Sequence, residues 1–244
     1  LNNNDRFQYI LPYYDFNKNF NLDFIEGNIN FKSSGSNNLN NTNKLKTRII
    51  NDLEYSSEEI ISNLGFVSKF NIYLKNLGTL GRNDSTYKSS PQVELMSLYE
   101  FTSDFPLRKQ TGSYNNTIIP KISLRFNPSD MKNYNTEDRN INVNNIFNIN
   151  RLGLSDTFEA GKSLTVGFDY KKENLDDINK YFELKLGSVF RDKEESFIPT
   201  SSTLNKRNSN LFGSATNFIN ENFSIDYNFM IDNNLDRFEY NSIT

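Results

Sequence analysis

Apolar and polar residues alternate with a period of two in segment after segment of this chain, and this pattern limits the fold more than any other feature. Between residues 44 and 56, for example, Leu45 and Ile49 fall on one set of alternate positions, and Lys46 and Arg48 fall on the other. Successive side chains of a β-strand point to opposite faces of a sheet, so such a segment has one apolar and one charged face. The chain is therefore expected to be all-β.

The same alternation recurs along the whole chain and predicts roughly ten to twelve strands. Besides the segment above, the apolar positions that carry it are Phe7, Tyr9, Leu11, Tyr13, Leu64, Phe66, Phe70, Ile72, Leu74, Val93, Leu95, Tyr99, Phe101, Phe105, Ile118, Ile122, Leu124, Phe126, Leu164, Val166, Phe168, Tyr170, Phe182, Leu184, Leu186, Phe190, Phe223, Ile225, Tyr227, Phe229 and Ile231. Short turns such as 171–180 are expected to alternate with long polar loops at 33–43, 78–91 and 127–142. In the run 20–32 the apolar positions change from even to odd numbers, at Leu22, Phe24 and Ile25, and this predicts a bulge or a strand that passes into a loop.

The composition favours a barrel with lipid on one side and water on the other. Only 36% of the residues are hydrophobic, yet 14% are aromatic, whereas a disordered chain of this polarity would be poor in aromatic residues. The charged face of each strand suits a wet barrel lumen and would be costly in a packed core. No apolar stretch approaches the roughly 20 residues of a membrane-spanning helix. We therefore predict an antiparallel transmembrane β-barrel; a soluble β-solenoid or sandwich, such as a surface adhesin, remains the alternative.

Residue types that are missing from the sequence exclude several kinds of chemistry. The 244 residues contain no His and no Cys, so Ser-His-Asp and Cys-His catalysis, His or thiolate metal sites and disulfides are excluded within them. The net charge is −3, and the dispersed basic residues do not predict nucleic-acid binding. We expect neither an enzyme nor a cofactor.

Adjacent carboxylates offer the remaining possibility for a site. Asp176-Asp177 and Glu194-Glu195 lie in polar, turn-like stretches. Asn174 with Asp176 and Asp177 could in principle bind Ca²⁺, but the closing Glu of a calcium loop is missing. We interpret both doublets as solvated loop charges and predict no metal site.

The most specific pattern runs from Ile119 to Tyr170 and reads IPKISLRFNPSDMKNYNTEDRNINVNNIFNINRLGLSDTFEAGKSLTVGFDY. It has a strand between two prolines, an acidic loop residue, a strand around Phe147, an Asn-Arg pair followed by spaced Asp, Glu and Gly residues, and a closing Gly-Phe-x-Tyr strand. The positions that carry the pattern are Pro120, Pro128, Asp138, Asn145, Phe147, Arg151, Asp156, Glu159, Gly161, Gly167 and Tyr170. In this order and spacing they resemble the lipopolysaccharide-assembly outer-membrane protein family, LptD. The segments 6–14, 186–191 and 209–213 are similar to further strands of that family.

The resemblance implies both a fold and a function. The intact family protein has a periplasmic β-jellyroll followed by a barrel of about 26 strands, at the upper end of the usual range. The chain begins at Leu1 without a signal peptide and stops at Thr244, so residues 1–244 are expected to be an internal portion of the barrel, without the jellyroll and the barrel ends. The implied function is assembly of lipopolysaccharide (LPS) into the outer leaflet of the bacterial outer membrane. A porin or a plugged nutrient transporter is the alternative among barrels.

The resemblance also implies partners and roles for residues. LPS would arrive along periplasmic bridge proteins, its lipid would leave through a lateral opening into the outer-membrane lipids, and a plug lipoprotein (LptE-like) would occupy the lumen. Arg151, Asp156 and Glu159 lie at a strand–loop–strand junction, where we expect ion pairs that order the connection. A sharper hypothesis is that Arg151 guides the anionic LPS headgroup.

Overall fold

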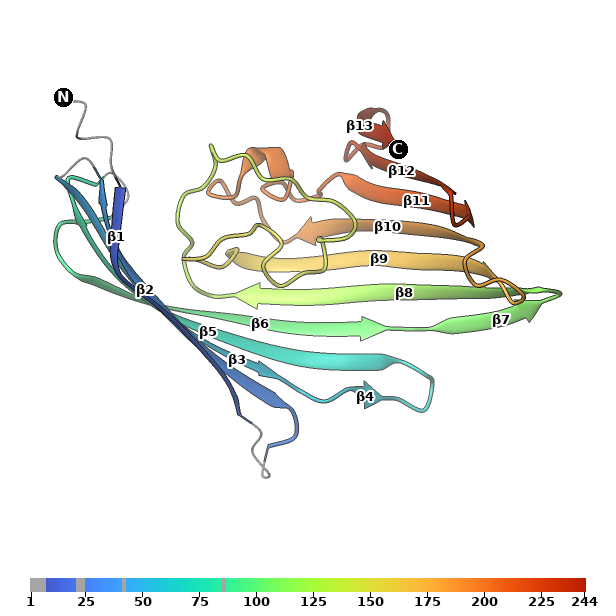
Figure 1. Ribbon diagram of the computed structural model, residues 1–244, viewed down its shortest axis with the longest axis horizontal. Helices are drawn as coiled ribbons and strands as arrows, with labels where there is room; N and C mark the ends of the chain where they lie inside the picture. Colours follow the sequence, from blue (N-terminus) through green and yellow to red (C-terminus); the bar gives the residue numbers. More distant parts are fainter. Residues whose placement is uncertain (1–7, 21–24, 41–42, 85–86) are drawn as a thin grey trace.

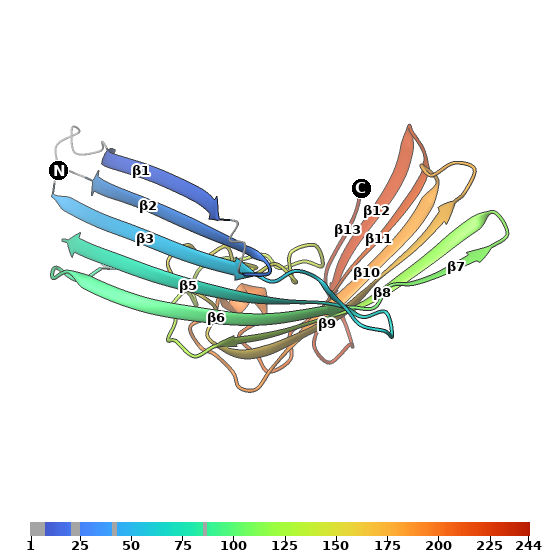
Figure 2. The ribbon, with the colours of Figure 1, turned by 90° about the horizontal axis from the view of Figure 1, so that it is seen from below.

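A single antiparallel sheet organises the computed structural model, which describes residues 8–20, 25–40, 43–84 and 87–244. Eleven of its 13 strands follow one another in the order of the chain, and the short strands β4 and β7 lie off this path. The path ends at β1 on one side and at β13 on the other, and the sheet curves between them without closing (Figures 1 and 2). This confirms the predicted all-β fold; the 13 strands are one more than the upper end of the predicted ten to twelve, because β4 and β7 are short strands beside the main path.

The strands are β1 (Gln8–Phe20), β2 (Asn28–Asn40), β3 (Lys44–Ser56), β4 (Ile60–Ile61), β5 (Val67–Arg82), β6 (Gln92–Asp104), β7 (Leu107–Thr111), β8 (Tyr114–Asn127), β9 (Gly161–Asn174), β10 (Tyr181–Arg191), β11 (Leu211–Asn220), β12 (Phe223–Ile231) and β13 (Phe238–Ile243). A 3-10 helix, η2 (Thr200–Ser202), lies between β10 and β11. In the described residues no helix has the length and apolar character to span a membrane.

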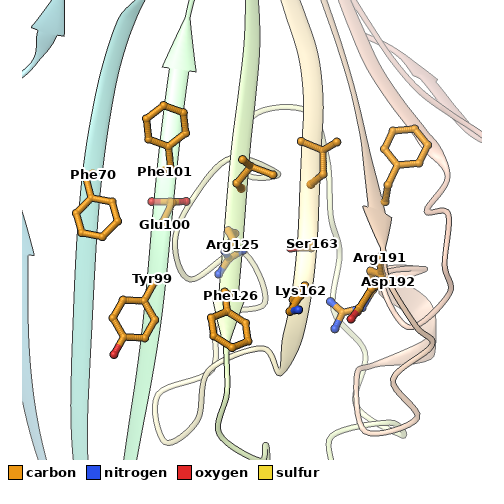
Figure 3. Close-up of a pocket in the computed structure, with 13 residues that line it drawn as sticks. Phe70, Tyr99, Glu100, Phe101, Arg125, Phe126, Lys162, Ser163, Arg191 and Asp192 are labelled. Atoms are coloured by element: carbon orange, nitrogen blue, oxygen red, sulfur yellow. The ribbon is translucent and has the colours of Figure 1, made fainter.

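Alternation along the strands produces two chemically different faces. On the face that we call the outer face, Phe66, Phe70 and Val166 are 40%, 39% and 39% exposed, and Phe168 is half-buried. Figure 3 shows the aromatic rings of this face standing on neighbouring strands. The opposite, inner face is lined by polar side chains that are buried, namely Asn71, Lys75, Glu100, Ser123, Arg125, Ser163, Thr165 and Arg191. The predicted apolar belt is therefore present on the outside, and the charged positions face inward.

All three predicted long loops are wrong in extent. The loop predicted at 127–142 runs from 128 to 160, and the other two are shorter than predicted. The segment 33–43 continues as strand to Asn40, and 78–91 continues as strand to Arg82. These polar residues extend in register with neighbouring strands, for example Asn38 opposite Lys46. The backbone ladder forms whatever the side chain is, so neighbours on both sides override the low strand propensity of Asn, Ser and Gly.

Of the two explanations predicted for the run 20–32, the bulge is wrong and the passage from a strand into a connection is confirmed. β1 ends at Phe20 and β2 begins at Asn28, and the two strands pair with Phe20 opposite Ile29. Each strand keeps its own alternation, so the change of phase marks a hairpin connection. Leu22 and Phe24, which suggested the bulge, lie outside the described residues.

The two longest connections fold back against the inner face. Residues 128–160 join β8 to β9, residues 192–210 join β10 to β11, and we call the two segments together the plug. They lie next to each other (Figure 1), and the Tyr134 N–H donates to the Phe197 carbonyl at 2.9 Å. The main hydrophobic core lies between the plug and the inner face and consists of Met131, Ile141, Val143, Ile146, Leu152, Leu154, Ala160, Val189, Ile198, Leu204 and Phe212. Asn145–Phe147, which the sequence predicted as a strand, forms a turn inside the plug.

Candidate functional site: the attachment of the plug to the inner face

A buried ion cluster fixes the C-terminal end of the first plug segment. Arg151 donates two hydrogen bonds to the carboxylate of Glu159, from Nε to Oε2 at 2.7 Å and from Nη2 to Oε1 at 2.6 Å. Two arginines of the wall join them: Arg191 of β10 donates to Oε1 of Glu159, and Arg125 of β8 lies 3.5 Å from Oε2. Parallel N–H···O bonds of this kind are the strongest geometry that a guanidinium can make with a carboxylate. The cluster therefore ties one plug segment to two strands.

Arg151 also reaches the strand between them. Its Nη1 donates to Thr165 Oγ1 at 2.8 Å and to the Ile146 carbonyl at 3.3 Å, and its Nη2 donates to Ser163 Oγ at 3.1 Å. The side chain of Arg151 has 0% exposure. All its donors are used, so Arg151 connects the turn at Ile146, the end of the plug and β9 in one network.

The electrostatics of the cluster keep Glu159 ionised. Burial alone would raise the pKa of its carboxyl, but the positive charges of Arg151, Arg125 and Arg191 outweigh burial and lower the pKa to about 2. One carboxylate thus faces three guanidinium groups in a site from which water is largely excluded. Removal of that carboxylate would leave three like charges without their common partner.

A second contact is centred on Asp156. Its carboxylate accepts hydrogen bonds from the Tyr87 hydroxyl at 3.0 Å and from the Tyr134 hydroxyl. Tyr87 belongs to the connection between β5 and β6, and Tyr134 to the plug. Burial and the neighbouring Asp156 raise the pKa of both phenols, so both stay protonated as donors.

In a third contact, an aromatic ring of the plug packs against two glycines of the sheet. Gly167 of β9 lies opposite Gly187 of β10, and the Phe147 ring of the plug covers both. A Cβ on Gly167 would lie 3.0 Å from that ring and 2.4 Å from the Leu186 carbonyl oxygen. Glycine is therefore needed at position 167 for space, because any side chain would push against the backbone of β10 and against the plug.

Further contacts extend the plug across the sheet. Ser155 accepts at its carbonyl from Lys75 Nζ of β5 at 3.0 Å and at its hydroxyl from Arg48 Nη1 of β3 at 3.0 Å. Lys132 pairs with Glu94 of β6 at 3.0 Å. An apolar patch on the inner face, Ile50, Leu77 and Met96, packs against Phe158 of the plug. The plug is thus held by strands from β3 to β10.

A comparison with known protein families gives the family of this chain. The sequence model of the LptD family, described as LPS transport system D, matches residues 6–244. The chain belongs to the LptD family. LptD proteins are outer-membrane proteins that transport LPS and assemble it into the outer membrane, and they catalyse no reaction. A search of curated proteins finds no match to this chain.

Five of the LptD pattern positions meet at the attachment of the plug. Arg151 pairs with Glu159, and Phe147 covers Gly167. Gly161 has a φ of +82°, a backbone conformation that favours glycine, and Arg191 Nη2 lies 3.2 Å from where its Cβ would be. Asp156 lies in the same segment but forms the separate contact with Tyr87 and Tyr134 described above.

The other pattern positions have local surroundings. Pro120 lies in β8 opposite the break between β6 and β7, where its carbonyl accepts from Phe105 N–H at 3.0 Å. Pro128 follows the last residue of β8, Asn145 bonds within its own turn, and Asp138 is exposed. Tyr170 donates to Asn116 on the outer face at 3.0 Å. None of these positions contacts the ion cluster in the described residues.

Sequence reasoning missed four residues of the attachment: Arg125, Arg191, Tyr87 and Tyr134. The alternation did place Arg125 on the polar face of its strand. Nothing in the sequence indicated that Arg125 and Arg191, from two different strands, share the carboxylate of Glu159, because that meeting depends on the order of strands in the sheet and on the inward path of the plug.

The hydrogen-bond partners of the acidic doublets, Asp176-Asp177 and Glu194-Glu195, do not suggest catalysis. Asn174 Oδ1 accepts the backbone N–H groups of Asp176, at 2.8 Å, and Asp177, at 3.3 Å, in a tight turn. Across the described ranges, no group of three or more acidic residues is arranged to hold a metal ion. The chemistry that the site supports is attachment: it fixes a segment across a polar channel wall.

Proposed function

We propose that residues 1–244 are an internal portion of the LPS-transport barrel and that the plug closes the polar space beside this stretch of wall. The observation that carries the proposal is the buried pair of Arg151 and Glu159, which joins the plug to three neighbouring strands. Outer-membrane barrels have short periplasmic turns and long external loops. The two long plug segments therefore belong to the external end, where an LPS sugar portion would leave the lumen.

In this proposal the pattern positions act structurally. The donors of Arg151 are all occupied and its side chain is buried, which favours a structural role over direct contact with the LPS headgroup. Lysine would preserve the charge but cannot form the paired hydrogen bonds of a guanidinium. Arg151→Lys therefore separates the two roles.

The test uses the intact protein in cells that depend on it. We expect Arg151→Lys to increase entry of a large polar antibiotic, because the plug loosens while the charge remains. If Arg151 instead guides the headgroup, Arg151→Lys would leave both permeability and surface LPS unchanged, whereas Arg151→Gln would reduce surface LPS. Normal permeability in both variants would contradict the structural role.

We further propose that the chain works with the partners that LPS transport requires, namely periplasmic bridge proteins that deliver LPS and a plug lipoprotein (LptE-like) inside the barrel. The inner face of the sheet is polar and extends beyond β3 to β1, which supports an additional occupant of the lumen. Photo-crosslinkers on the inner face of β2, for example at Lys32, should give an adduct with a lipoprotein. Adducts from outer-face positions alone would contradict this placement.

A further inference from the structure

The wall of the sheet has a notch between β6 and β8. β6 pairs with β5 from Gln92 to Asp104, but it pairs with β8 only from Tyr99 onward. Beyond that point β8 ends at Asn127 and the chain turns into the plug. The stretch Gln92–Leu98 therefore has an edge that faces no strand in the described residues, although it lies in the middle of the sheet.

Backbone groups point into this notch. The Ser97 N–H donates to the Ser129 hydroxyl of the plug at 3.2 Å. Alternate residues of a strand turn their N–H and C=O groups to the same side, so Val93 and Leu95 direct theirs into the notch as well. Within the described ranges, neither residue has a backbone partner on that side.

A row of polar side chains on the outer face leads to the same place. Ser33, Asn51 and Asn76 are direct cross-strand partners on β2, β3 and β5. Ser33 Oγ donates to Asn51 Oδ1 at 2.7 Å, and Asn51 Nδ2 donates to Asn76 Oδ1 at 3.2 Å. Asn76 lies opposite Leu95, and its Nδ2 has no hydrogen-bond partner within the described residues.

The surroundings of this row are apolar. A groove on the outer face is lined by Phe31, Leu53, Leu74, Leu95 and Tyr99 together with Asn51, Asn76, Ser97 and Ser129, and the inner-face residues Lys75 and Met96 also border it. Val93 and Leu95 are 74% and 76% exposed. Arg82, exposed at the end of β5, follows Leu80 on the same face and puts a cation at the external rim.

We propose that this notch is a lateral subsite for the lipid part of LPS, a lipid whose acyl region carries amide and hydroxyl groups and whose headgroup is anionic. In hydrocarbon, unpaired backbone groups cost several kcal/mol each, so they need partners. The carbonyls of Val93 and Leu95 need donors, and amide N–H and hydroxyl groups supply them. The acyl region of an ordinary ester phospholipid has acceptors only. Arg82 would face the phosphate. The proposal rests on LPS transport and adds a binding place on the barrel wall.

The experiment places a photo-crosslinking amino acid at position 95 of the full-length protein in living cells and measures the LPS adduct after irradiation. The matched position is Leu124, an outer-face residue of β8 that is 47% exposed and whose strand is paired on both sides.

We expect about five-fold more LPS adduct at position 95, and we expect Asn76→Leu to remove most of that excess because one hydrogen bond is lost. Thr47→Val, on the same face of β3, should leave it unchanged. Heat-resistant migration in detergent checks that both variants fold, since Asn76→Leu also removes the acceptor of the Asn51 amide.

Three results would overturn the subsite. Equal LPS adducts at positions 95 and 124 would indicate surrounding lipid only. A phospholipid adduct without LPS would show that the polar groups do not select LPS. A polypeptide adduct at position 95 would mean that an extended strand of a partner occupies the notch. Surface LPS is measured in the same cells: normal export without the excess adduct contradicts the subsite alone, whereas export that continues unchanged after depletion of this protein contradicts the transport role.

Discussion

Replacement of Glu159 by Gln should detach the plug while the wall stays paired. The variant keeps the size of the side chain but removes the negative charge that Arg151, Arg125 and Arg191 share. These four side chains are at most 5% exposed, so water cannot replace the carboxylate. The strands themselves are joined by backbone ladders that Glu159 does not form.

The magnitude follows from burial. Loss of one partner from a buried ion pair costs about 3–5 kcal/mol. At about 1.4 kcal/mol for each factor of ten, the equilibrium between attached and detached plug would shift by about two to three and a half powers of ten. An exposed pair in the same segment provides the control: Arg139 and Glu137 lie 2.6 Å apart with side chains 34% and 46% exposed, and such a pair contributes about 1 kcal/mol or less.

The assay is limited digestion of the intact outer-membrane protein by a non-specific protease added from outside. We expect Glu159→Gln to be cut rapidly within residues 128–160, and Glu137→Gln to be cut at the wild-type rate. Resistance of the barrel to unfolding in detergent should be similar in both variants, since the wall is intact. Equal digestion of the two variants would refute the reasoning, because the buried cluster would then contribute no more than an exposed pair.

Three further predictions follow from the same attachment. The pKa of Glu159 is lowered to about 2 from an ordinary value of 4.5. The contribution of Glu159 to the attachment of the plug is therefore fully present above about pH 4.5 and is lost as the pH falls through about 2. Protease protection of the plug should persist at pH 5 and decline only in stronger acid, and loss of protection near pH 6 would contradict this prediction. Gly167→Ala should lower the stability of the protein by about 1–3 kcal/mol through overpacking, seen as a lower temperature of unfolding in detergent. Adding Phe147→Ala to that variant should recover only part of the lost stability, because the contact of the new Cβ with the Leu186 carbonyl remains. Tyr134→Phe should weaken protection of the plug by about 1.5–3 kcal/mol, the usual value for a hydrogen bond to a charged group; an equal effect of Tyr134→Phe in an Asp156→Ala background would show that the bond to Asp156 is not the cause.

The sequence alone was sufficient to predict which side chains lie on each face of the sheet. A period of two decides which side chains share a face, and this needs no knowledge of neighbours: Phe70 and Val166 are on the apolar outer face, and Lys75 and Arg125 on the polar inner face, as alternation predicts. Where the alternation was weak the sequence misled. The Asn- and Ser-rich end of β2 was expected to be a loop, because its extended conformation comes from the neighbouring strands on both sides.

The LptD pattern in the sequence marked the right segment, and the ion pair expected there forms between Arg151 and Glu159. Asp156, which was expected to take part in ion pairs, accepts hydrogen bonds from Tyr87 and Tyr134 instead. Arg151 and Glu159 are eight residues apart, and their pairing could be anticipated within one connection. Their meeting with Arg125 and Arg191 could not, since it requires β8, β9 and β10 to lie side by side and the plug to fold inward over them.

What the sequence by itself determined is therefore the local alternation, since each strand residue faces one side or the other whatever surrounds it. What only the tertiary structure decided are the contacts between segments far apart in the chain: the shared carboxylate of Glu159, the ring of Phe147 on paired glycines, and the notch beside Leu95. These depend on strand order, register and the path of the plug, and side-chain alternation carries no information about any of the three.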